Sequence, residues 1–202
     1  MNLVELVKLK DISKAMYRGN GIKRDEVTID GTPCVRYGEI YTTYGLWFDK
    51  CISHTKNIKN PKYFENSDIL FAITGESVED IAKSTAYVGD KKCLAGGDIV
   101  VMKHNQNPNF LSQTLSTTES RNQKSKGKIK SKVVHSSVPD IENIIIPLPL
   151  CKKTQDKYAN IFDKFYLLCE SVEIGIPAEI KANRQRYEYY RDEIFESLKE
   201  CA

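Results

Sequence analysis

The hydrophobic pattern of this 202-residue chain changes its period near residue 150. Before that point, short runs of β-branched and aromatic residues are bounded by Gly, Asp and Asn, a pattern typical of short strands. After Lys152, apolar residues recur at every third or fourth position, at Tyr158, Ile161, Phe165, Leu168 and Val172. This spacing predicts a helix with an a/d seam. The chain must therefore combine a β-rich part with a long helical tail.

Short segments of the first part are predicted to form strands, namely TPCVRYG (32–38), DILFAIT (68–74), STAYVG (84–89), GDIVVMK (97–103), SKVVHSSV (131–138) and ENIIIPLP (142–149). Pro147 and Pro149 lack the N–H group that a central strand donates, so the last strand must end there or lie at a sheet edge. A short helix is expected around Phe110–Leu115. The pattern favours an α+β fold, with one domain at 1–150 and a helical region at 151–202.

Pro177 interrupts the tail, and Ile180, Tyr187, Tyr190 and Ile194 then resume a similar stripe. Two interpretations remain open: Pro177 lies in the first turn of a second helix, or it kinks one long helix. A fully helical tail would reach about 60–70 Å. Such a helix must bury its stripe, either against its own domain or against another helix. The narrow seam and the charged remaining faces favour a helix–helix contact.

The net charge of +3 is unevenly distributed along the chain. Residues 120–139 contain no acid and carry Arg121, Lys124, Lys126, Lys128, Lys130 and Lys132. Such a stretch is expected of a loop that contacts phosphates, although an ordinary solvated basic loop has the same composition. No apolar run reaches the roughly 20 residues that span a bilayer, and the N-terminus lacks the layout of a signal peptide. A cytoplasmic protein is expected, with its scattered cysteines reduced.

The sequence carries no motif for catalysis. The glycine pattern GxGxxG, the P-loop and the [DN]PP[FY] tetrapeptide of amino-methylating DNA methyltransferases are all absent. Pro139-Asp140 and Glu179-Ile180-Lys181 loosely match a metal-dependent nuclease pattern, but that chemistry requires the two acidic residues to converge on a metal. Glu179 is expected to open a helix well past the β-rich domain. We therefore predict no catalytic residue and no metal site.

The combination of segments resembles the specificity subunit of type I restriction–modification enzymes. The resemblance is carried by RYGEIYTTYG (36–45), DILFAITGESVEDIAKS (68–84), GDIVVMKHNQNPNFLS (97–112), IENIIIPLPL (141–150) and, most strongly, GIPAEIKANRQRYEYYRDEIFESL (175–198). It covers essentially the whole chain. It implies a β-rich target-recognition domain, followed by a long helix or helix pair that forms an antiparallel coiled coil and acts as spacer and dimerisation region.

The resemblance also implies a function without catalysis. Such a subunit binds double-stranded DNA and docks a methyltransferase subunit and, through it, a restriction subunit. S-adenosylmethionine, ATP and magnesium are then expected on those partners only. Typical members hold two recognition domains, whereas this chain has one and no internal repeat. A half-length subunit that acts as a homodimer on a split target is expected. A stand-alone DNA-binding regulator or an anti-restriction decoy is the alternative.

Phosphate contacts and base contacts are assigned to different segments. Lys124, Lys126, Lys128, Lys130 and Lys132 are expected to contact phosphates. Base readout is expected from Arg36, Tyr41, Thr43, Tyr44, Thr74, Glu76, Ser77, Lys103, His104, Gln106 and Asn107, with Arg36 and Gln106 favoured. Core packing remains the alternative for the tyrosines. The helix seam is assigned to Tyr158, Ile161, Phe165, Leu168, Ile180, Tyr187, Tyr190 and Ile194.

Overall fold

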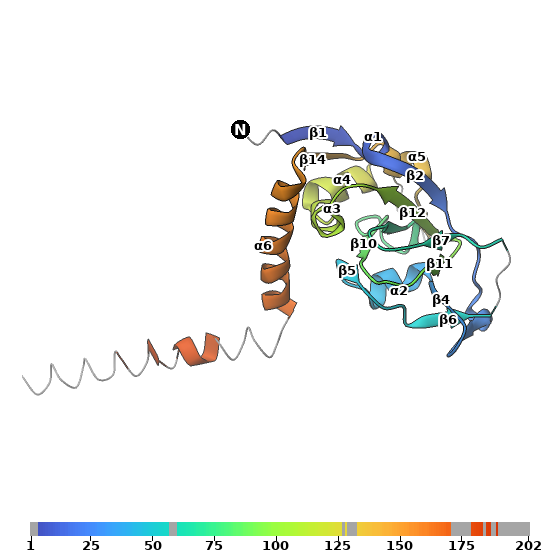
Figure 1. Cartoon of the computed structure of the whole chain (residues 1–202), viewed down its shortest axis with the longest axis horizontal. Coiled ribbons are helices and arrows are strands. Elements are labelled where there is room, and N and C mark those ends of the chain that lie inside the picture. The colour runs from blue at the N-terminus through green and yellow to red at the C-terminus, as the bar shows by residue number, and fades with distance from the viewer. Residues whose placement is uncertain are drawn as a thin grey trace, which may run out of the picture. The chain divides into compact units, whose positions relative to one another are not determined.

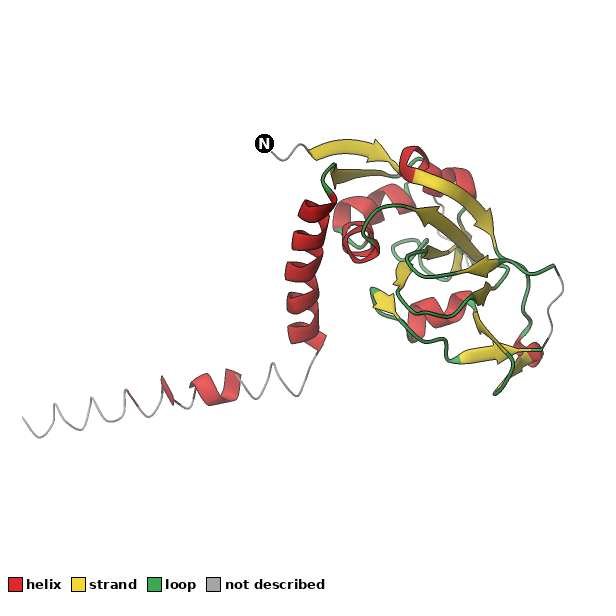
Figure 2. Cartoon of the chain, in the orientation of Figure 1, coloured by secondary structure: helices red, strands yellow, loops and turns green. Residues whose placement is uncertain are grey.

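The computed structural model describes residues 4–56, 60–126, 128 and 133–170, and residues 179–183, 185, 186 and 189 of the tail. The chain divides into two compact units, Met1–Ala159 and Asn160–Ala202. The first unit mixes many short strands with helices, as the ribbons in Figures 1 and 2 show, which confirms the α+β class. No helix among the described residues has the length and apolar character needed to cross a membrane.

The strands are short, and most of the helices are too. The strands are β1 (Val4–Lys8), β2 (Ser13–Arg18), β3 (Val27–Thr28), β4 (Thr32–Val35), β5 (Trp47–Phe48), β6 (Ser53–Thr55), β7 (Tyr63–Phe64), β8 (Ile69–Ala72), β9 (Thr74–Gly75), β10 (Ser84–Tyr87), β11 (Cys93–Ala95), β12 (Ile99–His104), β13 (Val134–His135) and β14 (Ile145–Pro149). The helices are α1 (Leu9–Ile12), a 3-10 turn η1 (Arg24–Glu26), α2 (Tyr37–Thr42), α3 (Pro108–Leu115), α4 (Thr118–Ser125), α5 (Val138–Glu142) and α6 (Lys152–Glu170).

A five-stranded sheet in the order β2-β12-β8-β10-β5 forms the centre of the first unit. Its middle strand is buried on both faces, because successive side chains of a strand point to opposite sides. Ile69 and Phe71 pack with helices α3 and α5 and with strand β14. Leu70 and Ala72 pack on the other side, against a second sheet in the order β3-β6-β4-β11-β7. The run DILFAIT is therefore the continuous apolar run of a doubly covered strand.

The space between the two sheets is filled largely by aromatic rings. Tyr44 stacks on Phe48 with ring centroids 4.0 Å apart, and Tyr87 lies 5.1 Å from Phe48 and 5.0 Å from Phe64. Ile40 of α2 joins the same cluster. The inner face of helix α2 thus packs on the aromatic cluster between the two sheets.

Among the described strands, β14 pairs with β1 alone, in a separate antiparallel ribbon with Leu6 opposite Pro147 and Val4 opposite Pro149. A two-stranded ribbon consists of edges, and an edge strand tolerates proline because its outward N–H positions need no partner. The expectation from Pro147 and Pro149 is confirmed. Ile146 and Leu148 point into the core, so the ribbon is held to the unit by alternate residues.

The structure differs from the predicted elements at three places. Of the strand expected over 32–38, only Thr32–Val35 is a strand, and helix α2 begins at Tyr37. Lys124, expected in a basic loop, lies in helix α4, whose N-cap Thr117 accepts a hydrogen bond from Ser120 N at 3.3 Å. Of the strand expected over 131–138, only Val134–His135 is a strand, and α5 begins at Val138 with Ser137 as its cap. Side chains accept hydrogen bonds from the free backbone N–H groups at the start of these helices. This capping stabilises the helices more than the strand-like composition of the segments disfavours them.

The start of α6 is fastened to the rest of the first unit by a buried amide, the side chain of Gln155. Its Oε1 accepts a hydrogen bond from Asn107 N at 2.9 Å. Its Nε2 donates to Gln106 Oε1 at 2.9 Å and to the carbonyl of Pro149 at 2.8 Å. Three segments therefore meet on one side chain, and the first turns of α6 belong to the compact unit that ends at Ala159.

Replacing Gln155 with alanine is expected to lower the free energy of unfolding by about 2–4 kcal/mol, because a buried N–H and a buried carbonyl lose their partners. Urea denaturation followed by circular dichroism measures the change. Lys157→Ala, an exposed change on the same helix, is the matched control and is expected to stay within about 0.5 kcal/mol of the parent. A loss below 1 kcal/mol for Gln155→Ala would show that other contacts hold the junction.

Helix α6 carries an exposed apolar face. Tyr158, Ile161, Phe162 and Phe165 are 43%, 39%, 43% and 64% exposed, and their spacing places them on one side of the helix. Ile180, in the helical residues 179–183, is 61% exposed. The side chain of Leu168 and the residues Tyr187, Tyr190, Ile194 and Gly175–Pro177 lie outside the described residues. The antiparallel coiled coil therefore stays a prediction.

Candidate nucleic-acid interface

Helix α2 lies between two pockets on the surface of the first unit. A pocket of about 690 Å³ is lined by Gly21, Ile22, Arg24, Arg36, Tyr37, Gly38, Glu39, Thr42, Gly96, Gly97 and Asp98. A second, of about 410 Å³, is lined by Tyr37, Gly38, Tyr41, Thr42, Thr74, Gly75, Glu76, Ser77, Asp80 and Val133. Tyr37, Gly38 and Thr42 line both pockets. The outer face of α2 therefore forms the ridge between two hollows.

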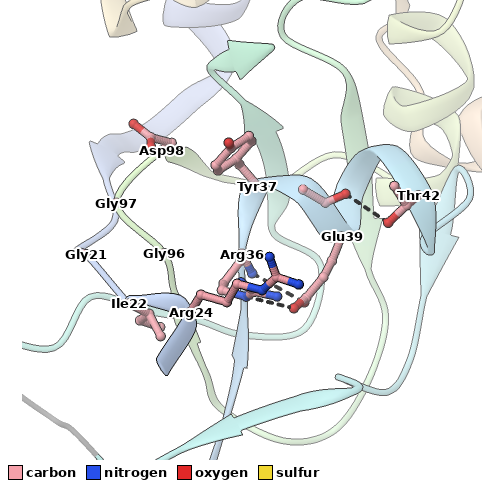
Figure 3. A pocket seen from close by; sticks show the side chains of 11 residues that line it. Gly21, Ile22, Arg24, Arg36, Tyr37, Glu39, Thr42, Gly96, Gly97 and Asp98 are labelled. Atoms are coloured by element: carbon pink, nitrogen blue, oxygen red, sulfur yellow. Dashed lines mark hydrogen bonds and ion pairs between the residues drawn. The ribbon is translucent and has the colours of Figure 1, made fainter. Parts of the chain in front are cut away.

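The first pocket contains a fixed arginine. Arg36 precedes α2, and its Nε donates to Glu39 Oε1 at 3.3 Å while its backbone N–H donates to Glu39 Oε2 at 3.3 Å. Glu39 is buried and also accepts a 2.7 Å hydrogen bond from the Ser53 hydroxyl. Figure 3 shows the side chains of Arg24 and Arg36 extending toward the same region beside Glu39. The arrangement holds the Arg36 guanidinium in one orientation, which lowers the entropy that it loses on binding.

The second pocket has a different chemistry, with carboxylates and hydroxyls. Strand β9 runs so close to α2 that a Cβ at Gly75 would lie 2.8 Å from Tyr41 Oη. The hydroxyl of Tyr41 donates to the carbonyl of Ala72 at 3.2 Å, and burial raises the pKa of this phenol. Ser77 donates to Glu79 Oε2 at 2.7 Å. Oxygen acceptors such as Glu76 and Asp80 suit a partner that offers N–H donors.

The basic stretch adjoins this second pocket. Strand β13 pairs with β9, with Val134 opposite Gly75 and His135 opposite Thr74, and Val133 lines the pocket. Lys126 is exposed, while Lys128 donates to Asp140 Oδ2 at 2.6 Å. Lys130 and Lys132 lie outside the described residues. Val133 and Val134 therefore lie beside the second pocket, shortly after the basic residues in the sequence.

Among the described residues of this stretch, Lys124 has a position that conflicts with its expected role. It is only 5% exposed, and its Nζ donates to the Leu115 carbonyl at 2.8 Å and to the Ser84 hydroxyl at 3.2 Å. Burial lowers the pKa of its amine to about 7. A phosphate contact through Lys124 is incompatible with this conformation, and its role is to pack α4 onto the central sheet.

The residues at the end of β12 are engaged in structural contacts. Lys103 pairs with Glu65 at 2.7 Å and with Asp68 at 3.0 Å. His104 is buried, and burial lowers its pKa to about 4. Gln106 is bonded to Gln155, as described above, and Asn107 accepts the α3 capping hydrogen bond from Phe110 N at 2.9 Å. The structure does not bring these four residues into the α2 pockets.

The remaining predicted base-reading residues separate into buried and exposed ones. Tyr44 is buried, and its hydroxyl accepts a hydrogen bond from Ile52 N at 3.0 Å, so the core-packing alternative applies to it. Thr74 is buried and its hydroxyl lies 3.2 Å from His135 Nδ1. Thr43 is exposed at the end of α2, with its hydroxyl 3.3 Å from that of Thr42. Arg36, Tyr41, Thr74, Glu76 and Ser77 are brought together around α2.

Sequence reasoning missed Arg24, Tyr37, Glu39, Thr42 and Asp80, which line the same two pockets. Arg24 lies in the 3-10 turn η1, far from α2 in the sequence. The signal for Glu39 was present, since an acid three residues after Arg36 fits both a helix start and an i,i+3 ion pair. The expectation of a strand over 32–38 left this helix start unrecognised.

The nuclease pattern has no support in the described residues. Asp140 accepts hydrogen bonds from Ser137 N and Ser137 Oγ, both at 2.9 Å, and caps α5. Within the part of the chain that the structure describes, no group of three or more His, Cys, Asp or Glu residues could hold a metal ion.

Comparisons with known proteins agree with this architecture. Three solved structures resemble the chain: the S subunit of a type I restriction–modification system from M. genitalium (TM-score 0.55, 15% identity, 93% of this chain and 44% of that one), a chain from a structural study of the assembly of a type I R-M system (0.60, 15%, 92% and 43%), and the HsdS subunit of Thermoanaerobacter tengcongensis (0.54, 14%, 80% and 36%). At these identities the likeness shows the fold alone.

The sequence comparisons identify the family. The specificity subunit of a type I restriction enzyme from Escherichia coli is 42% identical over 50 residues, which are 25% of this chain and 12% of that protein. The chain also covers less than half the length of the solved structures that it matches. The family model described as "Type I restriction modification DNA specificity domain" matches residues 1–182. The chain therefore belongs to the family of type I restriction–modification DNA specificity domains.

Proposed function

We propose that this chain recognises a DNA sequence on behalf of a type I restriction–modification complex and is not itself catalytic. The family membership supports this role. The observation that carries it is the α2 ridge, where a pocket with two arginines and a pocket with oxygen acceptors lie side by side, and where Val133, which follows the lysines of the basic stretch, lines the second. Donors and acceptors presented together are what base edges and phosphates require.

In this proposal the partners supply the chemistry. A methyltransferase subunit docks on the chain and a restriction subunit docks through it, and S-adenosylmethionine, ATP and magnesium bind to those subunits. The exposed face of α6 supports self-association, because an apolar stripe of this kind is stabilised when it is buried against a second one. A homodimer would present two recognition units related by twofold symmetry and would read a split target.

The test is selection of double-stranded DNA from a random library by the full chain, with a type I methyltransferase subunit present or absent. A sequence motif is expected to emerge, in two separated halves if the chain dimerises. A motif obtained with no association with the methyltransferase would favour a stand-alone regulator. Cleavage of DNA by the purified chain with magnesium would favour a nuclease, and absence of any preferred sequence would overturn the proposal.

Two lysines of the basic stretch provide a matched pair for the phosphate assignment. Lys126→Ala is expected to weaken binding to all sequences and to reduce the slope of log K against log salt by about 0.9, the value for one phosphate contact. Lys124→Met removes a lysine from a buried position and is expected to leave the slope unchanged. Equal slopes for both variants and the parent would remove the basic stretch from the interface. Fluorescence anisotropy at several salt concentrations measures both.

A further inference from the structure

Two backbone segments approach each other closely at the larger of the two α2 pockets. The chain at 19–21 lies against the chain at 95–97, with Asn20 N donating to the Ala95 carbonyl at 3.0 Å. A Cβ at Gly97 would lie 3.1 Å from the backbone of Gly21, so a side chain there would force the two segments apart. A Cβ at Gly38, by contrast, would meet nothing within 4 Å. Four of the eleven lining residues are glycines, so backbone forms part of the wall, and charged side chains supply the pocket's chemistry.

Two guanidinium groups and two carboxylates line the pocket, and Arg18 beside it adds a third positive charge. Glu39 is fully engaged with Arg36 and Ser53 and offsets one guanidinium. Asp98 at the rim is offset by Arg18, whose Nη2 lies 2.5 Å from Asp98 Oδ1. The exposed guanidinium of Arg24 has no ion pair or hydrogen bond to any of the described residues. One excess positive charge thus remains in a concave site, where the surrounding low-dielectric walls strengthen its field.

The shape of the site decides which part of DNA fits it. Base edges lie at the floor of a groove, so they are read by side chains that project from a protein surface. Arg36 does not project, since its side chain is 31% exposed and is tied back to Glu39. Backbone phosphates, in contrast, project from the duplex and carry the charge that guanidinium groups bind with paired N–H donors. The recessed Arg36 together with the exposed Arg24 matches a phosphate and not a base edge.

We propose that this pocket seats one phosphate of the DNA backbone between the guanidinium groups of Arg24 and Arg36, with Glu39 and Ser53 as positioning residues for Arg36. The inference rests on the proposed DNA-recognition function and deepens it. It changes the role of Arg36 from reading a base to fixing the register of the protein on the duplex. Sequence readout then falls to the neighbouring acceptor pocket.

The test compares Arg24→Ala, Arg36→Ala and the double variant in the full chain, on the duplex that the unmodified protein selects. Each single variant is expected to bind at least roughly tenfold more weakly, as for a lost charge-assisted hydrogen bond, and to keep the selected sequence motif. Because both arginines contact one phosphate, the double variant is expected to lose about 0.9 of salt slope and not twice that value. Lys50→Ala, at a different pocket, is the charge control.

A second pair of variants protects the test from loss of folding. Gly38 has open space at its Cβ position, and a non-glycine residue favours the helix. Gly38→Glu brings a negative charge to the pocket, whereas Gly38→Gln brings the same volume without charge. The glutamate variant is expected to bind DNA roughly fivefold more weakly than the glutamine variant at low salt, and high salt should remove most of the difference.

A scan of the same duplex with single methylphosphonates, which remove one phosphate charge at a time, locates the contact. One position is expected to weaken binding by the parent protein and to have little effect on the double variant. If the Arg36→Ala variant lost the preference for one base pair while its salt slope stayed the same, the inference would be overturned. Arg36 would then contact a base and not a phosphate. If the parent selects no motif at all, the proposed function fails, and that result is distinct from either outcome.

Discussion

Replacing Lys124 with methionine is expected to remove about 2 kcal/mol of the stability that the protein gains between pH 7 and pH 9. The amine of Lys124 is buried, and its neighbours are a hydroxyl, a carbonyl and the ring of Phe71. No carboxylate of the described residues forms an ion pair with it. Burial is the main cause that lowers its pKa from 10.5 to about 7, and the charge of Arg121 adds to the effect.

The direction of the pH dependence follows from proton counting. Between pH 7 and about 10.5 the unfolded chain keeps the proton on Lys124, whereas the folded protein has largely released it. Stability rises with pH wherever the unfolded state holds more protons. Burial of this lysine therefore costs most at and below pH 7, and the cost falls as the pH rises. Methionine has no proton to lose, so its variant lacks this contribution.

Urea denaturation at pH 7, 8 and 9 of the parent and the Lys124→Met variant measures the effect as a difference, in which the contributions of other titrating groups cancel. Lys126→Met, an exposed change two residues along the chain, is the control and is expected to follow the parent at each pH. If the parent and the Lys124→Met variant gained equal stability from pH 7 to pH 9, Lys124 would have to be charged or exposed in the folded protein.

Introducing two acids on the apolar face of α6 is expected to abolish self-association at micromolar concentration. Ile161 and Phe165 are exposed in the single chain and lie on one side of the helix. Burial of a large apolar side chain is worth about 1.5–3 kcal/mol. Removing two of them from each copy, and placing like charges there instead, corresponds to an increase of at least roughly 100-fold in the dissociation constant.

Sedimentation equilibrium of the parent and of the Ile161→Glu, Phe165→Glu double variant is the direct measurement. Asn160→Glu introduces an acid on the opposite side of the same helix at an exposed position and is the matched control, which is expected to dimerise like the parent. A parent protein that sediments as a monomer at micromolar concentration would contradict the homodimer. In that case the α6 face would have to be buried against a different partner.

The fold was predictable from the sequence where a residue pattern allows only one local structure. The apolar runs around Ile69, Ala86 and Val101 became the central strands, because continuous β-branched segments of this length are typical of doubly buried strands. Pro147 and Pro149 correctly placed β14 at an edge. The pairing of that strand with β1 was not predictable, since residues 4 and 149 are brought together only by the complete fold.

The candidate site was only partly predictable for the same reason. Arg36, Glu76 and Ser77 were recognisable as polar groups beside strand ends, and they do line the α2 pockets. The basic stretch misled where composition was taken as exposure. Lys124 lies only two residues before the exposed Lys126, and helix periodicity alone decides which of the two amines faces the core. Arg24 joins the site through tertiary packing that no local pattern records.

The β1–β14 ribbon has a further consequence. The strand that enters the recognition unit and the strand that leaves it are neighbours, paired from Val4–Pro149 to Lys8–Ile145. A unit whose entry and exit coincide is a cassette, which can be inserted into a chain or exchanged for another without moving the segments on either side. Recombination at the ribbon would therefore exchange both α2 pockets together, and under the proposed function this exchange would change the DNA target.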